Sequence, residues 1–223
     1  MKRKFKYVVI ITILLSIMIF KLFTFTTYHS YTTEIESIIA SSDVSTSIKE
    51  NVIQINYNGE SDYSFVIYGD SKYEGEAYIP LAISLSEELQ ANVRILKYNF
   101  LGNVNPILHQ PENEYVIAHG DGSEYLGFTI DEEDTVILLG STPFTKLKSY
   151  NVMMLQSNLD MVSEVIKNAL PTNTLYYSID KGNFSNYVYA SMHEKDASAL
   201  ISREEQINLC VKYIEDFISS LDL

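Results

Sequence analysis

The sequence has 223 residues, of which 46% are hydrophobic and 12% aromatic, and this length allows one domain with a sizeable core. Its formal net charge is −13, but five of the 16 basic residues lie at or before Lys21. The remaining chain therefore has 11 basic and 29 acidic residues, a balance that excludes nucleic acid as an expected partner. One cysteine, Cys210, excludes an intramolecular disulfide and lies in an amphipathic pattern that predicts a buried, inert thiol.

The N-terminus has the pattern of a signal anchor. A basic cluster at residues 2–6 precedes an apolar run from Tyr7 to Phe20, which continues beyond Lys21 to Phe25. A helix over residues 7–25 would be about 28 Å long, close to the thickness of the hydrocarbon core of a bilayer. Residues 21–30 contain no small-x-small cleavage site, so retention is expected. We predict a cytoplasmic tip and a transmembrane helix in residues 1–25, with the remaining chain outside the cell membrane.

The rest of the chain divides at about residue 50. Residues 26–50 are rich in Ser and Thr and are interpreted as a stalk, with a short helix possible at Glu34–Ala40. From residue 51 to 223, strand-like and helix-like segments alternate. Several strand-like runs are apolar on both faces, which indicates an α/β domain with a mainly parallel sheet and helices on both faces. The expected strands are Val52–Tyr57, Ser64–Tyr68, Val93–Tyr98, Tyr115–His119, Thr135–Leu139, Val152–Leu155 and Thr174–Ile179.

Two helices are expected from apolar residues at spacings of three and four. The first has an apolar stripe of Tyr78, Leu81, Ala82, Leu85 and Leu89. The second begins at a capping box formed by Ser202 and Glu205. Its expected buried face consists of Ile207, Cys210, Val211, Ile214, Phe217 and Ile218.

Three segments resemble the α/β-hydrolase family, specifically its compact, bacterial, membrane-anchored or secreted branch of dienelactone-hydrolase-like and esterase-like proteins. The first, residues 66–82, is similar to the family's strand, oxyanion loop and AYxPLA helix. The second contains Lys97 and Phe100 at the end of the next strand. The third runs from Gly182 and Asn183 through Asp196 to residues 201–206, and is similar to the segment that joins the catalytic-histidine loop to the last helix. The resemblance implies the α/β-hydrolase fold.

Hydrolases of this family need a serine on a strand-to-helix turn and a histidine that takes its proton. The family's turn corresponds to residues 118–123 here, and alternative alignments put Gly120 or Asp121 at the serine position. The residue that matches the catalytic histidine is Phe184, which cannot accept a proton. The resemblance therefore implies that both groups have been lost.

Other parts of the matched site are kept or altered. Asp160 follows an expected strand and matches the carboxylate that would orient the histidine. Gly69 and Asp70 match the oxyanion loop, so a carboxylate is expected where the family stabilises an anion. Only about a dozen residues, 122–134, separate the turn from the next strand, which leaves room for about two helical turns.

The resemblance leaves three functional hypotheses. A non-catalytic binding or scaffold domain, with an unidentified ligand or protein partner, accounts best for the joint loss of serine and histidine. An active esterase-like hydrolase would need an unusual nucleophile, Asp121 or Ser123, with Asp160 in support. The Asp121 route would also need His119 or His193 to replace the missing histidine. A paralogue without a retained role is the third. No phosphate loop, zinc spacing or dinucleotide fingerprint is present, and the acidic runs lack calcium-loop spacing, so no cofactor or metal is expected.

Overall fold

The computed structural model describes residues 2–24, 28–98, 114–141, 143, 146–159 and 170–221. Its centre is an eight-stranded sheet with the order β1-β2-β4-β3-β5-β6-β7-β8. Pairs that involve β2 are antiparallel, and the other neighbouring pairs are parallel. The strands are β1 (Val44–Ile48), β2 (Val52–Tyr57), β3 (Tyr63–Tyr68), β4 (Ala91–Leu96), β5 (Glu114–His119), β6 (Thr135–Leu139), β7 (Asn151–Ser157) and β8 (Leu175–Ile179).

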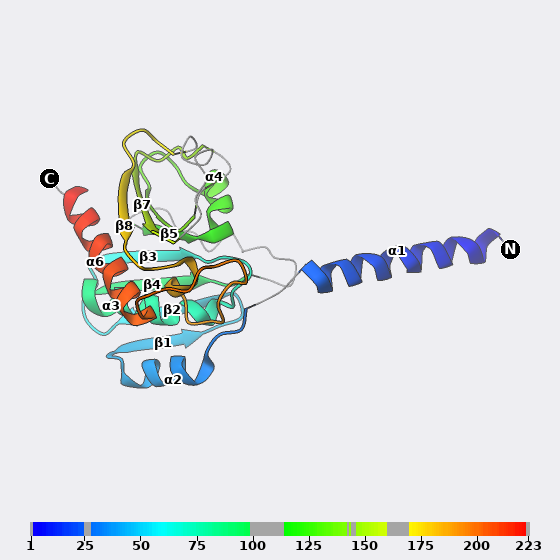
Figure 1. Ribbon diagram of the computed structural model, residues 1–223, viewed down its shortest axis with the longest axis horizontal. Helices are drawn as coiled ribbons and strands as arrows, with labels where there is room; N and C mark the ends of the chain where they lie inside the picture. The colour runs from blue at the N-terminus through cyan, green and yellow to red at the C-terminus, as the bar shows by residue number, and fades with distance from the viewer. Residues whose placement is uncertain are drawn as a thin grey trace.

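Both faces of the sheet are covered, as strand β3 illustrates. Because successive side chains in a strand point to opposite faces, Phe65 and Ile67 join one apolar cluster while Val66 and Tyr68 join another. The first cluster includes α3 (Ile79–Leu89) and α6 (Arg203–Leu221). The second includes Leu126 of α4 (Leu126–Thr129), on the other side of the sheet (Figure 1). The expected α/β architecture with a mainly parallel sheet is therefore confirmed.

The two expected helices are also confirmed. All five residues of the first predicted stripe are buried in α3 or in the 3-10 turn Gly75–Tyr78 that precedes it. At the start of α6, the Ser202 hydroxyl accepts a hydrogen bond from the Glu205 amide at 3.0 Å, as a capping residue does. Cys210 is fully buried there, and burial raises the pKa of its thiol well above the ordinary range.

The segment interpreted as a stalk contains part of the folded domain. Thr32–Ser41 form helix α2, which contacts α3, and Val44–Ile48 form β1 at the edge of the sheet. The sequence VSTSI gave no strong strand signal because three of its five residues are Ser or Thr. Residues 44–48 therefore belong to the sheet, and the expected boundary at residue 50 is too late.

Helix α1 (Lys2–Thr24) extends away from the sheet, as Figure 1 shows. The large apolar side chains described along it, from Tyr7 to Met18, are exposed. The sequence predicts a membrane-spanning helix over residues 7–25. Within the described residues, no helix reaches the combination of length and hydropathy that crossing a bilayer requires.

Candidate functional site

The carboxyl ends of β3 and β5 lie side by side and bring four of the sequence-predicted site residues together. Gly69 and Asp70 follow β3, while Gly120 and Asp121 follow β5. The contact between these two loops is close. A Cβ atom added to Gly122 would lie 2.2 Å from the Tyr68 carbonyl oxygen, so this position accepts only glycine without a rearrangement.

The space beside Gly120 is filled by the side chain of Asp70. Gly120 has a φ of 57°, in the left-handed region that favours glycine. A Cβ atom there would lie 2.0 Å from Oδ2 of Asp70 and 2.7 Å from its Cβ. A side chain at position 120 and the native position of the Asp70 carboxylate therefore exclude each other.

Asp70 is only 7% exposed, and its carboxylate is bound by backbone donors of both loops. Its Oδ1 accepts from the Lys72 amide at 2.9 Å, and its Oδ2 accepts from the Asp121 amide at 3.3 Å. The amide of Asp70 itself donates to the Tyr78 hydroxyl at 2.7 Å. A cluster of N–H groups at this position can stabilise an anion, and here the anion is a side chain of the same chain.

Asp121 is also held by the β3 loop. Its carboxylate accepts from the Ser71 amide at 2.6 Å and from the Ser71 hydroxyl. Burial and, secondarily, the negative charge of Asp70 raise the pKa of the Asp121 carboxyl above its ordinary value. The alternative nucleophile, Ser123, is 1% exposed and donates its hydroxyl proton to the Gly120 carbonyl at 2.9 Å.

His119 is a fully buried residue with a partner at each ring nitrogen. Nδ1 lies 2.8 Å from the Tyr78 hydroxyl, and Nε2 lies 3.2 Å from the Phe184 carbonyl oxygen. Since a carbonyl can only accept, we assign the proton to Nε2, and Tyr78 then donates to Nδ1. Burial lowers the pKa of His119 to about 3 despite the carbonyl, so the ring is neutral at physiological pH.

Phe184 lies against His119, with 4.1 Å between the ring centroids. Its 3-10 turn, Phe184–Tyr187, is fixed by the Asn183 side chain, which accepts from the Asn186 amide at 2.9 Å. Phe184 thus lies close to the Gly120 turn, as its match to the family's histidine requires, although its role stays a prediction. The matched acid, Asp160, lies outside the described residues, as does Phe100.

Sequence reasoning missed two groups that shape this site. Tyr78 was interpreted as a core residue of the helical stripe, yet its hydroxyl joins Asp70 to His119. Ser71 binds the Asp121 carboxylate from a loop fifty residues away. The contacts of Tyr78 with His119 and of Ser71 with Asp121 depend on the parallel pairing of β3 with β5, so no local spacing identifies them.

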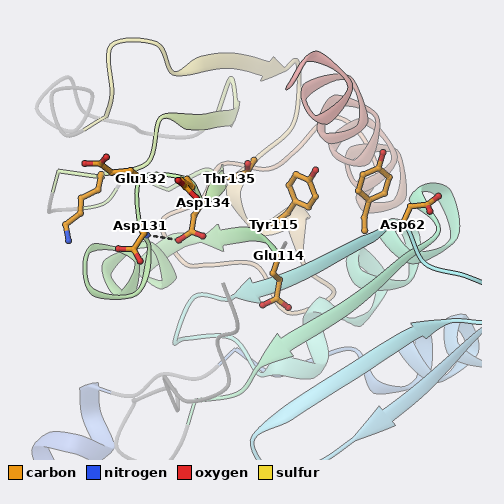
Figure 2. Close-up of a pocket in the computed structure, with 10 residues that line it drawn as sticks. Asp62, Glu114, Tyr115, Asp131, Glu132, Asp134 and Thr135 are labelled. Carbon is orange, nitrogen blue, oxygen red and sulfur yellow. Dashed lines mark hydrogen bonds between the residues drawn. The ribbon is translucent and has the colours of Figure 1, made fainter. Parts of the chain in front are cut away.

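A separate cavity of about 1230 Å³ lies at the amino ends of β3, β5 and β6 (Figure 2). Its two buried carboxylates have protein partners: Glu114 binds Arg94 at 2.6 Å, and Asp134 accepts from the Asp131 amide at 2.6 Å. Among the described residues, no group of side chains has the composition and arrangement of a metal site. The lining residues are Asp62, Tyr63, Glu114, Tyr115, Asp131, Glu132, Glu133, Asp134, Thr135 and Lys148.

Comparisons with known proteins identify the fold. No protein-family model matches the sequence, and no curated protein matches it. Among solved structures, carboxyl esterase 2 from the fungus Tuber melanosporum aligns with 79% of this chain and 87% of its own, with a TM-score of 0.53 and 8% identity. A hormone-sensitive lipase from a metagenome library aligns with 83% of this chain and 90% of its own, with a TM-score of 0.50 and 9% identity. This chain therefore has the α/β-hydrolase fold, shared with these esterases and lipases.

Proposed function

We propose that this protein is a non-catalytic member of the α/β-hydrolase fold that acts as a binding or scaffold domain. The observation that carries the proposal is the position of the Asp70 carboxylate. It fills the space that a side chain at position 120 would need, and it accepts hydrogen bonds from two backbone amides of the site. A nucleophile at position 120 and this carboxylate are incompatible.

The donors around the site support the same proposal. In hydrolases of this fold, the oxyanion is bound by the amide after the nucleophile and by an amide of the loop after β3. With the nucleophile position at Gly120, these donors correspond to the Asp121 amide and to those of Asp70 and Ser71. All three already donate to side chains of the protein. A substrate oxyanion would have to displace a bound carboxylate and would be repelled by its charge.

Both histidines considered as a base have partners at both ring nitrogens. In His193, Nδ1 accepts from the Lys195 amide at 3.2 Å, and Nε2 lies 3.3 Å from Nζ of Lys72. His119 is neutral, but its Nδ1 already accepts from Tyr78, and its Nε2 carries a proton that it donates to a carbonyl. Phe184 stands at the position matched to the family's histidine. Proton transfer from a nucleophile would therefore require His119 or His193 to exchange its present partners.

The second candidate function is an esterase-like hydrolase with Asp121 as nucleophile. The favouring observation is that Asp121 is only partly buried and lies beside Ser71 at the carboxyl ends of the strands. Its carboxylate, however, is bound by both donors of Ser71. An ester intermediate on Asp121 would break these bonds and would still need a base to activate water.

Ester hydrolysis by the full-length chain in detergent distinguishes the two functions. The substrates are p-nitrophenyl esters with short and medium acyl chains, and the variants are Asp121→Asn, Ser123→Ala and Asp160→Asn. We expect the rate of every protein to equal the buffer background. If the native chain turned over ester above background and one variant were slower by a hundredfold or more, the proposal would be overturned and the responsible group identified. A covalent adduct on Asp121 or Ser123, detected by mass spectrometry, would have the same meaning.

We further propose that the N-terminal helix attaches the domain to a membrane, with the domain on the extracytoplasmic side. The proposal rests on the basic cluster before the apolar run and on the exposed aliphatic side chains of α1, including Ile10, Leu14 and Ile17. Burying these side chains in lipid would remove apolar surface from water.

Flotation with phosphatidylcholine vesicles tests the attachment. The full chain should float with the vesicles, whereas the variant Ile10→Glu/Leu14→Glu should remain in the dense fraction. A matched variant with the same charges at two exposed positions of the domain, Ile48→Glu/Tyr150→Glu, should float like the native chain. Equal recovery of all three proteins in the dense fraction would contradict the proposal.

A further inference from the structure

The segment Tyr28–Tyr31, called the strap below, crosses between the two loops that border the candidate site. On one side, the Tyr28 amide donates to the Lys72 carbonyl at 2.6 Å, and Tyr28 forms a β-bridge with Tyr73. On the other side, the Tyr31 amide donates to the Tyr189 carbonyl at 2.9 Å, and Ser30 forms a β-bridge with Ala190. The strap therefore connects the loop after β3 to the loop that follows Phe184.

The strap is fastened by one carboxylate, that of Glu74. It accepts from the Ser30 amide at 2.9 Å and from the Ser30 hydroxyl at 2.7 Å, and it lies 2.8 Å from Nδ1 of His29. Burial alone would raise the pKa of Glu74, but these hydrogen bonds prevail and lower it. Three contacts from two consecutive strap residues thus converge on a single side chain.

The Tyr28 ring contacts a series of aromatic residues that extends to the site. Its centroid lies 5.3 Å from that of Tyr73 and 5.2 Å from that of His193. Tyr73, which is 3% exposed, in turn lies 6.4 Å from Phe184. Phe184 stacks on His119, the last residue before Gly120. Tyr28 is therefore the outermost ring in a series of aromatic contacts that ends at the site.

We propose that the strap is a closing device, which holds the two loops together over the candidate site and is latched by Glu74. The inference rests on the proposed location of the site, and not on whether the site has lost catalysis. Releasing Glu74 should free the strap and loosen the loop after β3. Helix α1 ends at Thr24, and three residues separate it from the strap, so the strap is the part of the domain nearest in sequence to the N-terminal helix.

Amide hydrogen exchange in the full-length chain in detergent tests the closing device. The reporters are the amides of Tyr28, Tyr31 and Ser191, the last of which donates to the His29 carbonyl. The Ser71 amide, which donates to Asp121, reports on the site itself. In the Glu74→Ala variant, we expect exchange at least tenfold faster at all four amides.

The matched control is Glu76→Ala, from the same turn, whose carboxylate binds Lys97 at 2.6 Å. It should leave the four reporter amides at the native rate. The amides of Ile117 and Ile137, in central strands, show whether a variant has unfolded globally. If Glu74→Ala unfolds, Glu74→Gln tests the latch by removing its charge, and Tyr28→Ala tests the closure by removing the covering ring with Glu74 in place.

Two results would overturn the proposal. Native exchange at the strap amides in a folded Glu74→Ala protein would show that Glu74 is no latch. Faster exchange at the strap with native exchange at Ser71 would show that the strap does not close the site. Neither result depends on ester hydrolysis, so failure of this inference is distinguishable from failure of the proposed function.

Discussion

Carboxylates lie at both ends of the central parallel strands, but their binding partners differ between the two ends. At the carboxyl ends, Asp70 and Asp121 turn toward backbone amides of the neighbouring loop. At the amino ends, Glu114 pairs with Arg94, while Asp62 and Glu132 line an open cavity (Figure 2). At the first end, backbone amides already donate to carboxylates of the same chain. The second is an acidic surface whose most buried charge is neutralised by a cation, which is an ordinary structural arrangement.

The largest expected effect concerns the carboxyl end and the substitution Gly120→Ala. The added Cβ would collide with Asp70 and would force a left-handed φ on a non-glycine residue. We expect a loss of about 4 kcal/mol of unfolding free energy, measured by urea denaturation, because overpacking and the left-handed conformation both contribute.

The double variant Asp70→Gly/Gly120→Ala is the control for this collision. Its unfolding free energy should exceed the value expected from adding the two single losses by at least about 1 kcal/mol, since the two positions compete for one space. Additive single effects would contradict the assignment of the Asp70 carboxylate to the space beside Gly120.

The next effect concerns the amino end. Arg94→Met would leave Glu114 buried without its cation, because the Glu114 side chain is only 4% exposed and Arg94 binds both of its oxygens, at 2.9 and 2.6 Å. We expect a loss of about 3 kcal/mol. The matched variant Arg94→Met/Glu114→Leu should be close to the native protein in unfolding free energy. A loss below about 0.5 kcal/mol in the single variant would mean that the pair is effectively solvated.

The smallest effect is a pH dependence that comes from His119. Its pKa falls from 6.5 when unfolded to about 3 when folded, so the stability that this group contributes is present above pH 6.5 and is lost as the pH falls toward 3. Between pH 7 and pH 5, the native chain should lose about 2 kcal/mol more than His119→Gln. If the unfolding free energies of the two proteins changed equally over this range, the assignment of a buried, neutral His119 ring would be wrong.

The fold could be predicted from the sequence to the extent that apolar patterns determine it. The strand Val52–Tyr57 and the strand Thr135–Leu139 have the bounds expected from their runs of β-branched residues. Strand β1 was missed because its Ser and Thr residues lie at the sheet edge, where no continuous apolar run is needed.

The site was predictable only in part. Matched motifs identified Gly69, Asp70, Gly120, Asp121 and Phe184, and the structure brings these positions together. They could not indicate that Asp70 fills the space beside Gly120, since that depends on the relative position of two loops separated by fifty residues. The contacts of Glu74 with His29 and Ser30 are equally remote, because the partners are more than forty residues apart in the sequence.

The Asp70 side chain also constrains how this chain could change over generations. A serine introduced at position 120 while Asp70 is present would meet the collision described above, and selection against unstable proteins would remove it. Loss of the carboxylate would have to come first, as a permissive step without any catalytic benefit of its own. Mutational routes to a serine at this turn are therefore ordered, and Gly120→Ser alone is disfavoured while Asp70 is present.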